Sequence, residues 1–381
     1  MALTTIQTNN KLIKFTQQVN REWVRENLFA PYMGESITAI IRKRMELTSG
    51  GEQMNIPLVA RLTATAVGSG ALAGNEESVD NYGMRVWIDW ARNAIKTNKA
   101  EKQKDSSAIF DVARPLLSDW LKELNRDEII DAFYALPSES APAGLGSAPG
   151  QRVNGILFGD ATAAQRDTWL TANFDRVLFG NLLANSVSSV FATSAALVLL
   201  NAANQANAAN MKFLKRYARA ANPKIRPFQL KDGREYFVAF HGSRTFRDLK
   251  TSLDTINQTT RPREGDGFNK NPIFQDGDQM YDGVIHREVP EIDTRVPTFL
   301  NTAGGTSSPI RPVWMCGQSA MAMAYGQMAK PTQLDNTDYQ FNQGVGIETA
   351  YGIAKMFKKT TGGLLKEWGI ATGYYNAPAD G

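Results

Sequence analysis

The chain has 381 residues, of which 43% are hydrophobic, and its formal net charge is +4 with a pI of about 9.0. This length allows about two or three domains with hydrophobic cores, and so small a charge excess argues against a dedicated nucleic-acid-binding protein. The single cysteine, Cys316, excludes an internal disulfide framework and suits a reducing cytosol. No basic segment followed by an apolar run opens the chain, so no secretory signal is expected.

The N-terminal part is predicted to be an arm with two helices. Residues 1–21 are polar and lack a strong period, so we expect them to be extended or mobile. A short helix is predicted over 21–28. A second is predicted from residue 36 because Ile37, Ile40, Ile41 and Met45 share one helical face. Its basic run, Arg42 to Arg44, could touch nucleic acid, although such a run is usually a solvated face.

The stretch from Glu52 to Arg92 shows the two-residue period of half-buried strands in both halves. The alternating apolar residues are Met54, Ile56, Leu58, Ala60 and Leu62, and then Tyr82, Met84, Val86, Ile88 and Trp90. A tip rich in Gly, Ala and Ser, residues 66–81, joins the halves and carries Asn75, Glu76 and Glu77. A two-stranded ribbon is marginal alone in water, so either another molecule covers the apolar face or the hairpin is the edge of a larger sheet.

The strongest helical pattern runs from Asp105 to Leu124, where apolar residues follow i, i+3, i+4, i+7 spacing. Pro115 lies inside this pattern, which predicts a kink or a break there. Asp127 is expected to cap a further turn or two that ends near Leu136.

The remaining chain is predicted to mix helices, loops and strands. Residues 137–150 read as a loop or linker, and residues 161–221 as mostly helical. The apolar run 187–200 is short for a membrane span and is predicted to be a buried helix. Strands are predicted at 226–230, 236–240, 280–289, 347–357 and 368–375, polar loops at 255–272 and 293–312, and a small-residue helix or buried strand at 315–328.

No motif in the sequence predicts catalysis. The two histidines, His241 and His286, lack the spacing of a metal site, and a histidine beside an apolar run is usually a structural residue. The segment from Gly68 to Gly74 resembles a phosphate-binding loop only loosely, because it lacks the Gly-Lys-Ser/Thr ending. We therefore expect no enzyme activity, no metal and no cofactor.

Several short segments occur in a fixed order between about residues 20 and 376. They are WVRENLFAPYMG from Trp23, IPLVARL from Ile56, GNEE from Gly74, IRP from Ile225, YFVAF from Tyr236, RDL from Arg247, YDGVI from Tyr281, CGQSA from Cys316 and GIE from Gly346. Each is weak alone. As an ordered set they resemble the major capsid proteins of N-four-like tailed bacteriophages, which have the Hong-Kong-97 capsid fold. Residues 137–168 match that family least.

The resemblance implies an α+β capsid fold of the Hong-Kong-97 type. Residues 1–51 would be the N-terminal arm, and residues 52–92 the long E-loop hairpin. Residues 93–194 would form a peripheral domain with an insertion and a spine helix at 105–124. An axial domain would cover 195–320, and residues 321–381 would return to the peripheral domain.

The resemblance also implies a function. The protein would be a major capsid protein that self-assembles, as hexamers and pentamers, into the icosahedral shell around the genome of a tailed double-stranded DNA phage. Expected partners are a separate scaffold, a portal, decoration proteins and, through non-specific contacts, packaged DNA. No membrane partner is expected. The protein would assemble in the host bacterial cytoplasm and reside in the virion capsid.

The residues expected at contacts between subunits come from the arm and the hairpin. They are Trp23, Phe29, Tyr32, Ile56, Leu58, Leu62, Asn75, Glu76, Glu77, Val86, Ile88 and Trp90, and the residues expected to face DNA are Arg42, Lys43 and Arg44. Two alternatives stay open at this point. One is a DNA-binding or packaging-associated phage structural protein that uses the basic clusters at 42–44 and 96–104. The other is an enzyme with a dispersed site around His241 and Asp248.

Overall fold

The computed structural model describes residues 22, 24–104, 112–181, 200–229, 233–260, 278–302, 309–334, 339 and 341–380. These residues form two compact units. Unit 1 contains the described residues of 1–27, 91–125 and 328–349, and unit 2 those of 28–90, 126–327 and 350–381. The chain passes from one unit into the other along β5 (Asp89–Asn98), α2 (Ala113–Tyr134), β12 (Met321–Gln333) and β13 (Asn342–Lys355).

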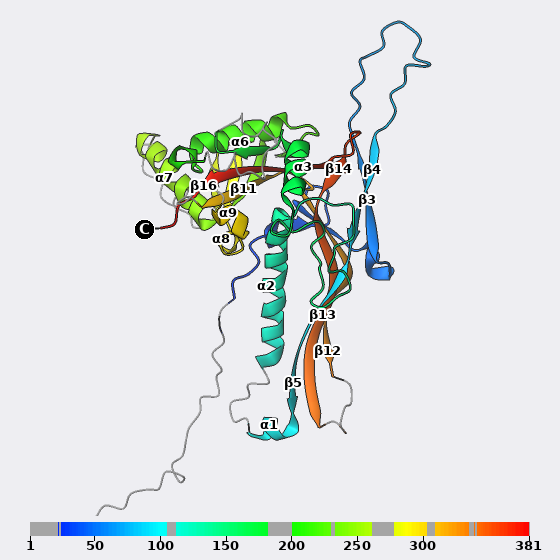
Figure 1. Ribbon diagram of the computed structural model, residues 1–381, viewed down its shortest axis with the longest axis vertical. Helices are drawn as coiled ribbons and strands as arrows, with labels where there is room; N and C mark the ends of the chain where they lie inside the picture. Colours follow the sequence, from blue (N-terminus) through cyan, green and yellow to red (C-terminus); the bar gives the residue numbers. More distant parts are fainter. Residues whose placement is uncertain are drawn as a thin grey trace, which may run out of the picture. The chain divides into compact units, whose positions relative to one another are not determined.

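The main core of unit 2 is built on a mixed sheet. In the described residues its strand order is β6 (Val177–Phe179), β16 (Ile370–Asn376), β11 (Ile310–Cys316), β8 (Glu235–His241), β10 (Val284–Glu288) and β9 (Asp278–Tyr281), with β7 (Phe228–Gln229) on β8. All of β11 is buried, as expected for a central strand. The helices α6 (Ala208–Ala220) and α7 (Ser243–Thr260) lie by this sheet (Figure 1). Leu214 and Leu249 of these helices pack with Phe237 and Met315 of the sheet.

Local sequence signals explain several helix starts in unit 2. Thr162 caps α3 (Ala163–Asn173) through a capping box with Gln165, and the Asn207 side chain accepts from Asn210 N at the start of α6. Two short helices, α8 (Glu291–Thr294) and α9 (Thr298–Thr302), lie within the predicted loop 293–312 or at its edge, and β11 begins inside that range. The loop predicted over 255–272 begins too early, because α7 continues to Thr260.

A second sheet has the order β1 (Met33–Gly34), β2 (Ile41–Arg44), β12, β13 and β5 in the part of the chain described here. β2 runs parallel to β12 with Ile41 opposite Met321. The helix predicted from residue 36 is therefore wrong, because residues 36–40 form a turn and residues 41–44 form a strand. The described residues of 21–28 are not helical either, and a single 3₁₀ turn, η2 (Ala30–Tyr32), follows them.

The long helix is α2, which begins at Ala113 and runs unbroken to Tyr134. Residues 105–111 of the predicted helix lie outside the described residues. Pro115 causes no break because it lies in the first turn of α2. Backbone N–H groups in the first turn have no acceptor within the helix, so the N–H that proline lacks is not needed there. Asp127 does not cap a new turn. It lies inside α2 and pairs with Arg126 and Arg295 at 2.9 Å each.

The hairpin is present as β3 (Gln53–Val59) and β4 (Asn81–Trp87), paired antiparallel from Gln53–Trp87 to Val59–Asn81. Another short pair, β14 (Phe357–Lys359) and β15 (Leu365–Glu367), packs near it, and β14 contacts β4. The predicted strands at 236–240, 347–357 and 368–375 are confirmed by β8, β13 and β16. The strand predicted at 280–289 is two strands, β9 and β10, separated by a turn at Asp282 and Gly283.

Residues 137–150 form a loop, as predicted, and 315–328 contributes strand rather than helix. The region 161–221 is less helical than predicted, since β6 interrupts it after α3 and residues 182–199 lie outside the described part. The predicted buried helix at 187–200 falls almost wholly there. None of the helices in the described ranges has the length and apolar character needed to cross a membrane.

Unit 1 holds the outer parts of β5, β12 and β13 together with α1 (Lys99–Lys104), which follows β5 directly (Figure 1). Lys99 N donates to Phe341 O at 3.0 Å, and Leu334 N donates to Gly344 O at 3.0 Å. Arg92 lies 3.9 Å from Glu348. The basic cluster at 96–104 thus comprises the end of β5 and the helix α1, with Lys104 paired to Glu101 at 2.9 Å.

Candidate functional site

The hairpin buries one face against the protein's own unit 2. Ile56 is 2% exposed and Val86 fully buried, in a cluster with Ala322 of β12 and with Ala354 and Met356. Alternation in the sequence explains which residues point inward, because neighbouring side chains on a strand point to opposite faces. Val59, on the opposite face, is 56% exposed.

This packing corrects one expectation from the sequence. The resemblance placed residues of the hairpin's apolar face at contacts between subunits, but the same chain covers that face. Phe29, Ile56, Leu58 and Val86, all expected at subunit contacts, are buried inside a single subunit. Phe29 packs against Phe133 and Phe240, with ring centroids 5.8 and 4.9 Å apart.

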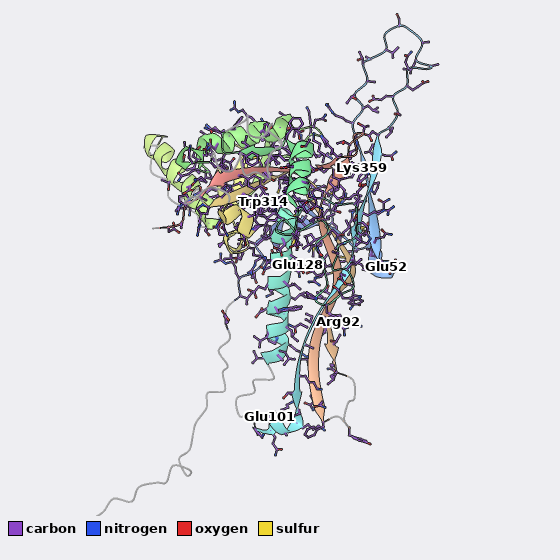
Figure 2. The ribbon with its side chains drawn as sticks, viewed as in Figure 1. Glu52, Arg92, Glu101, Glu128, Trp314 and Lys359 are labelled. Carbon is purple, nitrogen blue, oxygen red and sulfur yellow. The ribbon has the colours of Figure 1, made fainter. Side chains whose placement is uncertain are left out.

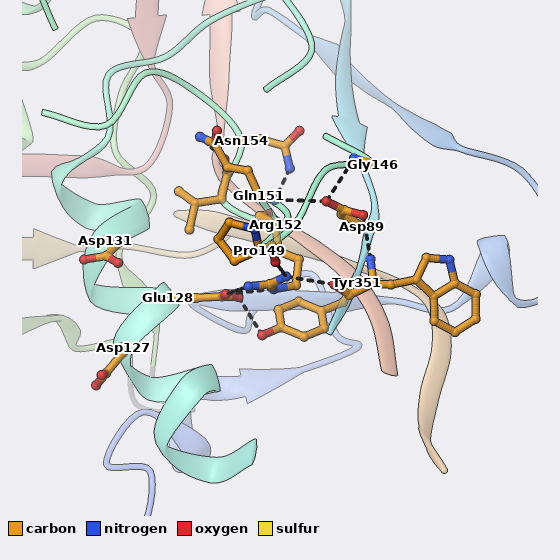
Figure 3. Close-up of polar contacts among 12 residues, drawn as sticks. Asp89, Asp127, Glu128, Asp131, Gly146, Pro149, Gln151, Arg152, Asn154 and Tyr351 are labelled. Carbon is orange, nitrogen blue, oxygen red and sulfur yellow. Dashed lines mark hydrogen bonds and ion pairs between the residues drawn. The ribbon is translucent and has the colours of Figure 1, made fainter. Parts of the chain in front are cut away.

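The base of the hairpin is held by the loop that leads into residue 154 (Figure 3). Asn154 forms a pair of hydrogen bonds with the backbone of Trp87: its Oδ1 accepts from Trp87 N at 2.8 Å and its Nδ2 donates to Trp87 O at 2.9 Å. Asp89 Oδ2 accepts from Gln151 N at 2.9 Å and from Gly146 N at 3.2 Å. These hydrogen bonds hold the end of β4, at Trp87, and the start of β5, at Asp89, against the loop of residues 146–154.

A buried ion pair between Arg152 and Glu128 also holds the base of the hairpin. Arg152 NH1 donates to Trp90 O at 2.8 Å, and its Nε donates to Glu128 Oε1 on α2 at 2.7 Å. Tyr351 OH donates to Glu128 Oε2 at 2.5 Å. Burial raises the pKa of the Glu128 carboxyl, and the Arg152 guanidinium opposes this effect. No sequence signal indicated this trio, because its members stand at positions 128, 152 and 351 and share no motif.

The tip of the hairpin is exposed. Leu62, Leu72 and Val79 are between 56% and 65% exposed, and Asn75 and Glu76 are exposed as well. Glu77 ties the two sides of the tip together, since its carboxylate accepts from Thr63 N at 2.6 Å and from Ala64 N at 2.8 Å. These hydrogen bonds lower the pKa of Glu77. In Figure 2 Lys359 lies beside the end of the hairpin where this tip begins, and Glu52 lies at the opposite end.

The other residues singled out in the sequence are spread over unit 2. Trp90 is 49% exposed at the hairpin base, whereas Ile88 is half-buried against the hairpin cluster. Tyr32 is half-buried and stacks edge-on against Phe240 at 5.3 Å. The basic run 42–44 is half-buried on β2, with Arg44 paired to Glu46 at 3.0 Å. Trp23 lies outside the described residues.

The two histidines lie together but form no catalytic arrangement. His241 Nε2 and His286 Nδ1 are 2.8 Å apart, and both side chains are fully buried. Burial lowers the pKa of His286 to about 3 and holds the pKa of His241 well below its usual range. Asp248 pairs with Arg247 at 2.8 Å. Among the residues described here, no group of three or more His, Cys, Asp or Glu side chains could hold a metal ion.

A family model described as phage capsid protein matches residues 4–374. The chain belongs to the phage capsid protein family. It is a major capsid shell protein with a Hong-Kong-97-like fold, and its place is the virion capsid. No curated protein matches it.

Solved capsid structures agree with this assignment. The capsid asymmetric unit of cyanophage Pam1 is 33% identical, with a TM-score of 0.84 and 100% of both chains covered. The capsid of Ralstonia phage GP4 is 15% identical, with a TM-score of 0.68 and 100% of both chains covered. The head structure of Helicobacter pylori bacteriophage KHP40 is 14% identical, with a TM-score of 0.59, and 97% of this chain and 96% of that chain are covered. The last two support the fold alone.

Proposed function

We propose that this capsid protein builds its shell from hexamers and pentamers in which hairpin tips reach neighbouring subunits. The observation that carries this proposal is the contrast along one hairpin. Its strands are packed into the subunit's own core, whereas its tip exposes apolar side chains such as Leu62 and Leu72 to solvent. Because the base of the hairpin is already fixed, only the tip has to be ordered when it docks, which suits repeated contacts around a closed shell.

We propose that the chain is divided into the segments of a Hong-Kong-97-type capsid subunit. Residues 1–51 form the arm, 52–92 the E-loop, 93–194 the peripheral domain, 195–320 the axial domain, and 321–381 the return to the peripheral domain. The helix α2 takes the place of the spine helix. Residues 41–44 of this arm form β2 and pair with β12, so this part of the arm is fixed within its own subunit.

The proposed contact residues fall into two groups. Leu62, Asn75, Glu76 and Trp90 are exposed and are proposed to touch a neighbour directly. Buried residues such as Ile56 and Val86 act only by holding the strands that carry the tip.

The remaining partners are proposals as well. They are a separate scaffold, a portal, decoration proteins and packaged double-stranded DNA, with assembly in the bacterial cytoplasm. The DNA contact would use Arg42, Lys43 and Arg44, whose half-buried positions leave only part of each side chain for a phosphate.

Expression of the chain with and without the phage's scaffold tests the assembly. Sedimentation and electron microscopy should show capsomers, shells, tubes or sheets. A strictly monomeric protein at high concentration, with the scaffold present, would overturn the proposal. Because DNA binding depends steeply on salt, a stable monomer that binds DNA strongly only at low salt would point to a packaging-associated protein instead.

A further inference from the structure

A groove of about 1140 Å³ lies in unit 2 beside the start of the hairpin tip. Its walls come from segments far apart in the sequence. They include residues 57–61 and Thr63 at the end of β3, residues 222–227 after α6, and Met356 with residues 358–361 around β14.

The groove carries an excess of positive charge. Eight lysine and arginine side chains line it, against three acids. Four of the cations have acidic partners: Lys358 pairs with Asp80, Lys359 with Glu139, Lys366 with Asp175 and Arg219 with Glu235. In the part of the chain that the structure describes, Arg42, Arg61, Lys224 and Arg226 form no ion pair. Like charges gathered in one groove repel one another, and an acidic partner relieves that repulsion.

The same groove has apolar walls. Its apolar lining includes Leu58, Ile225, Phe237, Met356 and Trp368. A nucleic-acid backbone presents phosphates but no apolar side chains, and the groove's own acids would repel it. A protein segment with both acidic and apolar side chains fits this lining better.

We propose that the groove of one subunit binds the hairpin tip of a second copy of this chain, at residues 72–76. Residues 63–79 contain two acids, Glu76 and Glu77, and no lysine or arginine. Leu72 is 65% exposed, and Glu76 is exposed with its carboxylate bonded only to Gly74 N, at 2.7 Å, among the described residues. The tip therefore offers an acidic side chain that complements the groove's unpaired cations and an apolar side chain that can pack on its apolar wall.

The geometry of the tip explains why the occupant comes from another copy. Residues 64–76 are absent from the groove lining, and Figure 1 shows this loop extending away from the strands that carry it. Glu77 lines the groove of its own chain and is bonded to Thr63 and Ala64, so Glu76 is the acid available to a neighbour. A tip on one surface and a groove on another make a heterologous contact, which forms a ring such as a capsomer when the rotation between copies closes.

This inference rests on the proposed assembly, and a charge exchange tests it. Lys224→Glu with Arg226→Glu in the groove, or Glu76→Lys in the tip, should each reduce sedimenting particles roughly tenfold or more. Combining the three substitutions should restore most particles, because opposite charges meet again. The control reverses two exposed cations of α6 outside the groove, Lys212→Glu with Arg216→Glu, and should assemble normally.

A cysteine pair gives a second readout on intact particles. Asn75→Cys with Lys224→Cys should give oxidised multimers on non-reducing gels, and neither single variant should, because the native Cys316 is buried. Multimers should form in assembled particles and not in the dilute subunit.

The outcomes separate this inference from the proposed function. Normal shells from both charge variants, without multimers from the cysteine pair, would refute the groove contact and leave the capsid assembly standing. Groove variants that assemble normally but retain less DNA would show that nucleic acid is the occupant, which also overturns the proposal. Failure of the unchanged chain to assemble with its scaffold would refute the proposed assembly itself.

Discussion

The sharpest prediction separates the buried strands of the hairpin from its exposed tip. Ile56→Ala removes three carbons from a side chain that is 2% exposed in the subunit's own core. At ~0.8 kcal/mol per buried carbon the transfer loss is about 2.4 kcal/mol, and the cavity beside Ala322 and Met356 adds to it. We expect a total loss of about 3 kcal/mol. At ~2.1 cal/mol/K of unfolding entropy per residue, a chain of 381 residues should then show a fall in the melting temperature of roughly 4 °C.

The assay is calorimetry or circular dichroism of the unassembled subunit, beside sedimentation of assembled particles. The matched control, Leu62→Ala, also removes three carbons, but from a side chain that is 62% exposed. Leu62→Ala should change the free energy of unfolding by less than about 0.5 kcal/mol and should reduce assembly. The reasoning fails if Ile56→Ala leaves the melting temperature of the subunit unchanged while it abolishes particles. The Ile56 side chain would then be buried by a neighbouring subunit and not by its own chain.

Three further predictions concern the interior of unit 2. Burial lowers the pKa of His286 from 6.5 to about 3, so its contribution to stability is complete above pH 6.5 and is lost as the pH falls toward 3. At pH 4.5 the loss should be roughly 3 kcal/mol, and His286→Gln should make the melting temperature less dependent on pH in this acid range. Arg152→Met leaves the buried Glu128 carboxylate without its cation and should cost about 3 kcal/mol, whereas adding Glu128→Gln should recover part of that loss in urea unfolding. Gly352→Ala would place a Cβ 1.8 Å from Trp87 O, so soluble yield and melting temperature should both fall, and a variant as stable as the unchanged chain would contradict the packing described here.

The sequence alone determined the hairpin and the family. Alternating apolar residues in 54–62 and 82–90 specify two strands and their inward faces, because the two-residue period is a local property of the chain. The ordered motifs identified the capsid family, which the family model confirms.

Tertiary partners decided what local patterns could not. Ile37, Ile40 and Ile41 have helical spacing, yet residues 41–44 form a strand because β12, about 280 residues later, offers a partner edge. The cover of the hairpin likewise comes from Ala322, Ala354 and Met356, far along the chain. No local period encodes such a pairing, since the free energy of burial depends on which surfaces meet in space.

The anchor of the hairpin and the basic groove were decided in the same way. Arg152, Glu128 and Tyr351 come from a loop, a helix and a strand, and each has an unremarkable sequence context. Lys224 and Arg226 become a charged groove only when β3 and β14 stand beside them. Charge and burial at such sites depend on distances in space, and the sequence specifies those distances only through the complete fold.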